Sequence, residues 1–193
     1  MKPNVTKKYL SLLTQSSRQR VLEVLFRYPE KEFSLSDVAK EAGVAKPHLG
    51  SILKELEQLG YLTITKLTKI WRIKANQQSG NFIRSKIIYN LNFVYQSGLV
   101  EFLTEHFVNP KAIILFGSFR KGEDFSTSDI DIAIETETEE YKTFPLVTLI
   151  ESFERVIGRK IQIHLFNQKN VDLHVFNNIA NGIVLAGFLE VKL

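Results

Sequence analysis

One short stretch of the chain combines residue types that could bind a phosphate group. Residues 111–116, KAIILF, form a continuous apolar run suited to a buried strand, and Gly117 and Ser118 follow it directly. Glycine lets the backbone turn and approach a ligand without a side chain in the way. Ser118 adds a hydroxyl and a backbone N–H, and Lys121 adds a positive charge within one turn. This combination favours contact with phosphate oxygens.

Two carboxylates follow in the next apolar run, SDIDIAIE at 128–135. The two-residue period of a strand places Asp129 and Asp131 on one face, with their Cα atoms about 7 Å apart, and the isoleucines on the other. Paired carboxylates suit one or two Mg²⁺ ions, which also take substrate phosphates and can clamp both oxygens of a phosphoryl transfer. Alone, Gly-Ser is commonly a plain turn and Asp-x-Asp a solvated edge strand. Their combination on consecutive predicted strands favours a site.

Gly117-Ser118, ten intervening residues and Asp129-Ile130-Asp131 resemble the signature of the DNA polymerase beta-like nucleotidyltransferases in their minimal form. The resemblance extends over residues 85–193, ending in IANGIVLAGFLEV. It implies that Asp129 and Asp131 are catalytic and hold Mg²⁺, while Gly117, Ser118, Lys121 and Ser128 bind a nucleoside triphosphate, expected to be ATP. Minimal members often act as antitoxins that adenylylate a helical partner toxin, so the resemblance favours a protein hydroxyl as acceptor.

The chain departs from that family at one position. The resembling enzymes use a third carboxylate on a later strand, and the matching strand here, KIQIHLF at 160–166, has Gln162 in its place. Gln162 and His164 are expected to share the face of the site, with His164 either a general base or a hydrogen-bonded structural residue. Two hypotheses follow: a transferase, or a degenerate domain that serves as a nucleotide sensor or dimer platform.

The elements of the first half predict a winged helix-turn-helix. Apolar spacing and capping residues predict three helices within 16–30, 33–44 and 45–60, followed by two alternating strands at 61–66 and 69–74. The third helix is expected to bury Leu49, Ile52, Leu53, Leu56 and Leu59. Residues 8–76 resemble winged-helix regulators of the multiple-antibiotic-resistance and arsenic-resistance classes.

The opposite face of that third helix carries the residues expected to contact double-stranded DNA. Short polar side chains suit base edges and lysines suit phosphates, and the wing could reach the flanking backbone. The candidates are Lys46, His48, Ser51 and Lys54 on the helix and Lys66, Lys69 and Arg72 on the wing. Docking to a protein or to RNA stays open as the alternative.

Charge is distributed unevenly along the 193 residues. Residues 1–80 carry 14 basic and 7 acidic side chains, whereas residues 81–193 carry 11 and 14. A basic first part and an acidic second part indicate two domains with different partners. The acidic run at 135–140 is expected to be a solvated loop.

We therefore expect three parts: a winged helix at 1–79, a connecting helix at 80–108 with a break at Ser97-Gly98, and an α/β nucleotidyltransferase-like domain with a mixed sheet at 109–193. Apolar residues cover more than one stripe of the connector, so part of it is expected to pack on the second domain and part either to bridge the domains or to form a dimer contact. The resemblance to winged-helix regulators, which often dimerise through such helices, implies a homodimer. The chain has no cysteine and no run long enough for a membrane helix, so we expect a cytoplasmic protein that does not bind a membrane.

Overall fold

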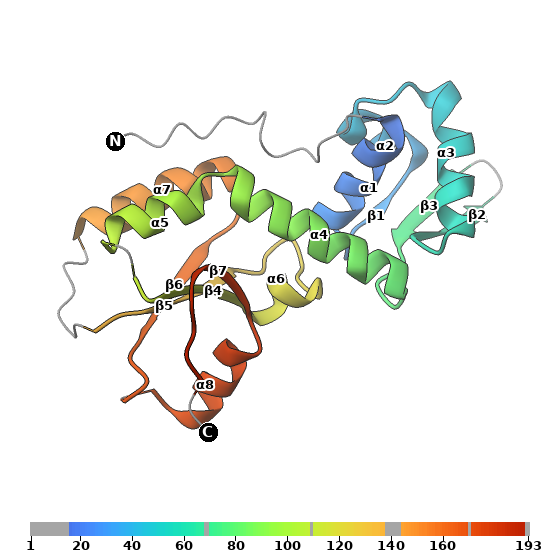
Figure 1. Ribbon diagram of the computed structural model, residues 1–193. Coiled ribbons are helices and arrows are strands. Elements are labelled where there is room, and N and C mark those ends of the chain that lie inside the picture. Colours follow the sequence, from blue (N-terminus) through green and yellow to red (C-terminus); the bar gives the residue numbers. More distant parts are fainter. Residues whose placement is uncertain (1–15, 68–69, 109, 138–143, 170, 192–193) are drawn as a thin grey trace. The chain divides into compact units, whose positions relative to one another are not determined.

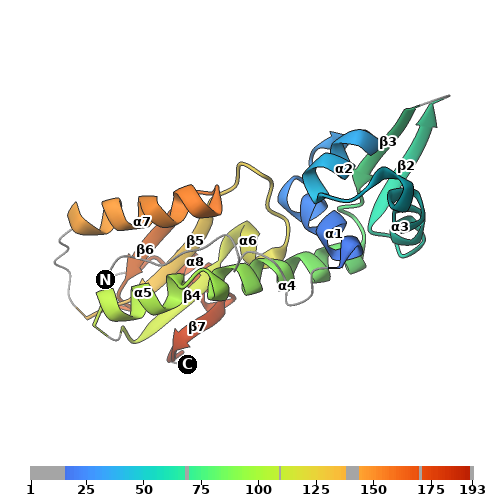
Figure 2. The same ribbon diagram turned by 90° about the horizontal axis from the view of Figure 1, so that it is seen from above.

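A computed structural model describes residues 16–67, 70–108, 110–137, 144–169 and 171–191 (Figures 1 and 2). The chain divides into two compact units, and the boundary falls between Tyr89 and Asn90, inside helix α4 (Gly80–Gln96). Each unit contains its own sheet and its own core of buried apolar side chains. The predicted mixed α/β class is confirmed.

The N-terminal unit has the predicted winged helix-turn-helix order. Its elements are α1 (Ser17–Arg27), β1 (Glu32–Phe33), α2 (Leu35–Ala42), α3 (Lys46–Gln58), β2 (Leu62–Leu67), β3 (Ile70–Ala75) and the first part of α4. The three strands form an antiparallel sheet in the order β1-β3-β2. The wing is the β2–β3 hairpin.

Local signals explain where helices α1 and α2 begin and where the chain turns between α2 and α3. The Ser16 hydroxyl accepts a hydrogen bond from the backbone N–H of Gln19 at the start of α1. Ser34 and Asp37 form a capping box at the start of α2, which satisfies backbone N–H groups that the helix leaves free. Gly43 then takes a left-handed conformation, with φ of 60°, in the turn to α3.

Helix α3 buries one face and exposes the other. Leu49, Leu53 and Leu56 are fully buried, and Ile52 packs partly against the same cluster. Leu59, expected on the buried stripe, is 45% exposed because the helix ends at Gln58 and Leu59 caps it. The polar face of α3 is therefore exposed.

The C-terminal unit contains the rest of α4 and a four-stranded mixed sheet. Its further elements are α5 (Leu99–His106), β4 (Ala112–Phe116), α6 (Gly117–Lys121), β5 (Ile130–Glu135), α7 (Phe144–Ile157), β6 (Ile161–Phe166), α8 (Leu173–Ala180) and β7 (Ile183–Gly187). The strand order is β6-β5-β4-β7, with β5 and β6 parallel and the other pairs antiparallel. The predicted break between helices is confirmed: α4 ends at Gln96, and Gly98 precedes α5.

Helices cover the two faces of this sheet in three layers, with α5 and α7 on one face and α8 on the other (Figure 1). The alternation along β5 follows the predicted period of two. Ile130, Ile132 and Ile134 pack in the cluster with α5 and α7, whereas Ala133 packs in the cluster with α8. The side chain of Asp131 therefore belongs to the α8 face of the sheet.

The prediction of a solvated loop at 135–140 is wrong for its first residue. Glu135 is the last residue of β5, pairs with Ala112 and Phe166, and is only 6% exposed. In the sequence, a charged residue at the end of an apolar run favours a prediction of solvent exposure. In the structure, strand β5 continues through Glu135. Residues 138–140 lie outside the described residues.

Candidate active site

Gly117 lies directly against one of the two carboxylates. Strand β4 ends at Phe116, and Gly117 begins the short helix α6 with φ of 73°. A Cβ atom at this position would overlap the Oδ2 atom of Asp131. Glycine is thus needed both for the left-handed backbone and for the close approach of the carboxylate. The turn and Asp131 are brought together, as the sequence pattern predicts.

The parallel register of β5 and β6 brings Gln162, at the position expected for a third carboxylate, next to the Asp129–Asp131 pair. Asp131 lies opposite Gln162, and Ala133 lies opposite His164. The Gln162 amide nitrogen donates to Asp129 Oδ2 over 3.2 Å, and His164 Nε2 lies 3.4 Å from Asp131 Oδ1. The side chains of Asp131 and His164 are 27% and 43% exposed, so the cluster opens to solvent.

The ring of His164 also packs on an aromatic neighbour. Its centroid lies 5.0 Å from that of Phe116, at an interplanar angle of 74°. An edge-to-face contact of this kind restricts the orientation of the imidazole. The contacts with Phe116 and Asp131 therefore both orient the His164 ring.

The other predicted phosphate ligands occupy different places. Ser118 is half-buried in α6, and Lys121 is exposed at its end. Ser128 stabilises a turn, because its hydroxyl accepts a hydrogen bond from the backbone N–H of Phe125 over 2.9 Å. The structure thus gives the Ser128 side chain a local structural contact.

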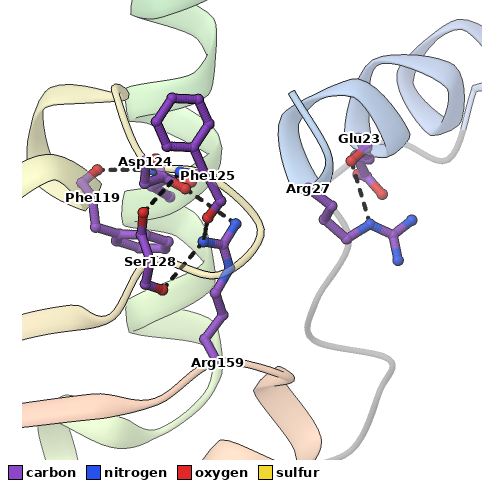
Figure 3. A network of polar contacts seen from close by, with 8 residues as sticks. Glu23, Arg27, Phe119, Asp124, Phe125, Ser128 and Arg159 are labelled. Atoms are coloured by element: carbon purple, nitrogen blue, oxygen red, sulfur yellow. Dashed lines mark hydrogen bonds and ion pairs between the residues drawn. The ribbon is translucent and has the colours of Figure 1, made fainter. Parts of the chain in front are cut away.

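A buried network holds the loop that leads into Asp129, and sequence reasoning missed it (Figure 3). Asp124 is fully buried, accepts a hydrogen bond from Asn90 over 2.9 Å and pairs with Arg159 at 3.1 Å. Arg159 also donates to the backbone carbonyls of Phe125 and Ser128. Asp124 and Arg159 are far apart in sequence, within stretches that look solvated, and no spacing pattern connects them.

Two carboxylates and an amide offer only part of a metal site. Among the residues that the structure describes, no three His, Cys, Asp or Glu side chains are grouped so as to hold a metal ion. Asp129 and Asp131 still provide the hard oxygen donors that Mg²⁺ takes when substrate phosphates complete its coordination. The absence of a Cβ at Gly117 lets the Asp131 carboxylate lie directly against the backbone of the turn. These residues fit a magnesium ion delivered with a nucleotide better than a metal held by protein alone.

The structure separates the predicted DNA-binding residues into three groups. Lys46, His48, Ser51 and Lys54 are all exposed on α3. Lys66 lies over the Trp71 ring at 5.0 Å, and Arg72 donates two hydrogen bonds to Glu32, which lower the pKa of that carboxyl. Lys69 lies outside the described residues. The α3 face therefore carries exposed positive charge, whereas Glu32 neutralises the charge of Arg72.

Comparisons with known proteins agree with this geometry. Residues 98–187 match the family model "Polymerase beta, Nucleotidyltransferase". A 54-residue segment, 28% of this chain, is 41% identical to "Putative protein adenylyltransferase MJ1379" of Methanocaldococcus jannaschii and spans 54% of that protein.

A solved structure titled as that of transcriptional regulator PA4135 is 17% identical, with a TM-score of 0.35, and the match covers 49% of this chain and 65% of that one. None of the helices described here is long and apolar enough to cross a membrane. Asp129, Asp131 and Gly117 all lie within the matched range. Residues 98–187 of this chain therefore resemble a nucleotidyltransferase domain of the polymerase beta family.

Proposed function

We propose that this protein binds Mg-ATP in its C-terminal unit and transfers the adenylyl group to a hydroxyl of a partner protein. The proposal assigns Asp129 and Asp131 to the metal, and Gly117, Ser118 and Lys121 to the triphosphate. The family match and the relative named as a protein adenylyltransferase support it. Because the matched segment spans about half of that relative, the substrate is part of the proposal.

One observation carries this proposal: the carboxylate of Asp131 rests on the Gly117 turn, on the solvent-open side of the sheet. The phosphate-binding turn and the metal-binding carboxylates are thereby adjacent. In the reaction, the acceptor oxygen forms a bond to the α-phosphorus, the bond from that phosphorus to the bridging oxygen breaks, and pyrophosphate and a proton leave. Bound magnesium would neutralise charge on the phosphates.

The test is a thermal shift measured with and without Mg-ATP. We expect the wild-type protein to melt at a higher temperature with Mg-ATP, because a ligand that binds only the folded state stabilises it. Asp129→Asn with Asp131→Asn should abolish the shift, and Glu123→Gln, an exposed carboxylate outside the site, should retain it. A wild-type protein without any shift would rule out nucleotide binding.

A second candidate is a nucleotide sensor without transferase activity, and Gln162 favours it. Its amide occupies the third position and already donates to Asp129, and a neutral amide cannot take a proton at neutral pH. ATP labelled on the α-phosphate separates the two functions when incubated with candidate partner proteins. Covalent label that requires Asp129 supports the transferase, and Mg-ATP binding without label supports the sensor.

For the N-terminal unit we propose binding of double-stranded DNA. The exposed face of α3 presents Lys46 and Lys54 for phosphates and His48 and Ser51 for base edges. The excess of basic over acidic residues in the first 80 residues adds a sequence-independent attraction for a polyanion. Together the two units would make a transcriptional regulator that carries a transferase domain, and we propose that it acts as a homodimer.

A further inference from the structure

A separate cavity lies at the opposite end of the sheet from the carboxylate pair. Its volume is about 680 Å³, within the range of small-molecule sites. The start of β4, the ends of β5 and β6, helix α8 and the segment after β7 all contribute to its wall. Its main lining residues are Glu135, Glu190, Lys111, Lys169, Phe176 and Phe188. Asp129 precedes β5 and Glu135 ends it, so the cavity is distinct from the candidate active site.

The buried charge in this cavity is negative. Glu135 is 6% exposed, whereas the Lys111 side chain is 54% exposed and its Nζ lies 2.8 Å from Glu137. Lys169 is also exposed. The lysines are therefore at the rim, and Lys111 already has a counterion. An anion entering the cavity would approach a buried carboxyl, which is unfavourable.

The surroundings of Glu135 disfavour the charged form of its carboxyl, as its raised pKa indicates. Burial raises the pKa of this carboxyl, and nearby Glu190 also raises it. Lys111 and a hydrogen bond with Gln168 act in the opposite direction without cancelling the effect. A bound cation would offset the cost that burial places on the charged form.

The remaining wall is apolar and partly aromatic. Phe176 is half-buried on α8, and Phe188 is 75% exposed after β7. Leu173, beside them on the wall, is 67% exposed. Aromatic faces attract cations and cover apolar stems, so these rings complement the buried Glu135 carboxylate in the same cavity.

We propose that this cavity binds a small organic cation, with an ammonium or guanidinium group against Glu135 and an apolar stem against Phe176 and Phe188. The buried carboxylate supplies the charge recognition, and the rings supply the contact area. Neither feature takes part in the proposed nucleotide chemistry.

The test compares three probes of similar size by calorimetry with the full chain: 3-phenylpropylammonium, 3-phenylpropan-1-ol and 4-phenylbutyrate. We expect the ammonium to bind most tightly, and more tightly as the pH rises and Glu135 ionises. Glu135→Gln should weaken ammonium binding at least tenfold, because it removes the charge and keeps the shape. Glu123→Gln should leave it within twofold. Phe188→Ala, at an exposed position where folding is not at stake, should also weaken it.

Three results would overturn the proposal: equal binding of the alcohol, tighter binding of the carboxylate, or no binding of any probe at millimolar concentration. Unchanged ammonium affinity in a folded Glu135→Gln protein, judged by its melting transition, would overturn it as well. A protein that acts on a macromolecule through this surface would bind a basic peptide and none of the three probes.

Discussion

At the scale of single residues, Gly117 connects the backbone turn to the carboxylate pair. Gly117→Ala should add the roughly 1 kcal/mol cost of a left-handed non-glycine residue and also push the Asp131 side chain away. We therefore expect the Mg-ATP thermal shift to be lost. Gly158→Ala is the matched control, because Gly158 has φ of 71° and open space where the Cβ would lie. A normal Mg-ATP shift in Gly117→Ala would show that the turn does not touch the ligand.

Substitution of Gln162 tests whether the absence of a third carboxylate limits the reaction. Gln162→Asp should increase transfer of α-labelled phosphate from ATP, because it adds a negative oxygen donor beside Asp129 and Asp131. The same change should lower the melting temperature without ligand, because three like charges then lie together. Gln162→Asn keeps the position neutral and should give neither effect. If Gln162→Asp transfers no more label than the wild type, the amide is not what limits transfer.

The sequence allowed the prediction of part of this site for a simple reason. A strand has a period of two, so the side of the sheet reached by Asp131, Gln162 and His164 follows from the order of residues. The Ser128 hydroxyl bonds to a backbone N–H three residues away, which depends on the shape of the turn and not on the strand period. The partner of Arg72 lies on a strand forty residues away, and no local pattern contains it. For the same reason the burial of Glu135 was missed, since it depends on packing across the sheet.

At the scale of elements, Asp124 and Arg159 connect the loop before β5 to the start of β6. Asp124 is fully buried, and the Arg159 side chain is only 9% exposed. Removing one partner of a buried pair leaves an uncompensated charge, which costs about 3–5 kcal/mol. We expect Arg159→Gln to destabilise the C-terminal unit by this amount. Adding Asp124→Asn should recover part of the loss.

Urea unfolding followed by circular dichroism measures this difference. The only tryptophan, Trp71, is in the N-terminal unit, so its fluorescence reports that unit and should not change. Arg155→Gln, an exposed arginine on α7, is the control. Equal stability of Arg159→Gln and the wild type would mean that the pair contributes nothing to the fold.

The elements themselves were largely predictable, because each depends on local signals. Capping by Ser16 and Ser34 and the turns at Gly43 and Gly98 act within a few residues. The network around Asn90 required the tertiary structure, since it joins helix α4 to helix α6 and to the loop after α6, which are distant from it in the sequence. Sequence patterns therefore predict the helices and strands that carry the site, but not the tertiary contacts that hold these elements together.

At the scale of the whole molecule, two units with different charge share one helix. The boundary lies within α4, so the same helix contributes Phe82 and Tyr89 to one core and Phe93 and Val94 to the other. Basic residues exceed acidic ones in the first 80 residues, and acidic residues exceed basic ones after them. A polyanion and a nucleotide are thus expected to bind through different units.

This division predicts that the two proposed activities can be removed separately. Lys46→Ala with Lys54→Ala should weaken binding to a DNA duplex and reduce the slope of log K against log salt by about 2, one for each lost phosphate contact, while the Mg-ATP thermal shift persists. Asp129→Asn with Asp131→Asn should do the reverse. Arg155→Ala with Lys160→Ala removes the same charge from exposed positions of the C-terminal unit and should leave the DNA affinity within twofold. Fluorescence anisotropy across a salt series measures the DNA affinity and its dependence on salt. If the Arg155 and Lys160 variant loses as much affinity as the Lys46 and Lys54 variant, net charge and not the α3 face governs binding.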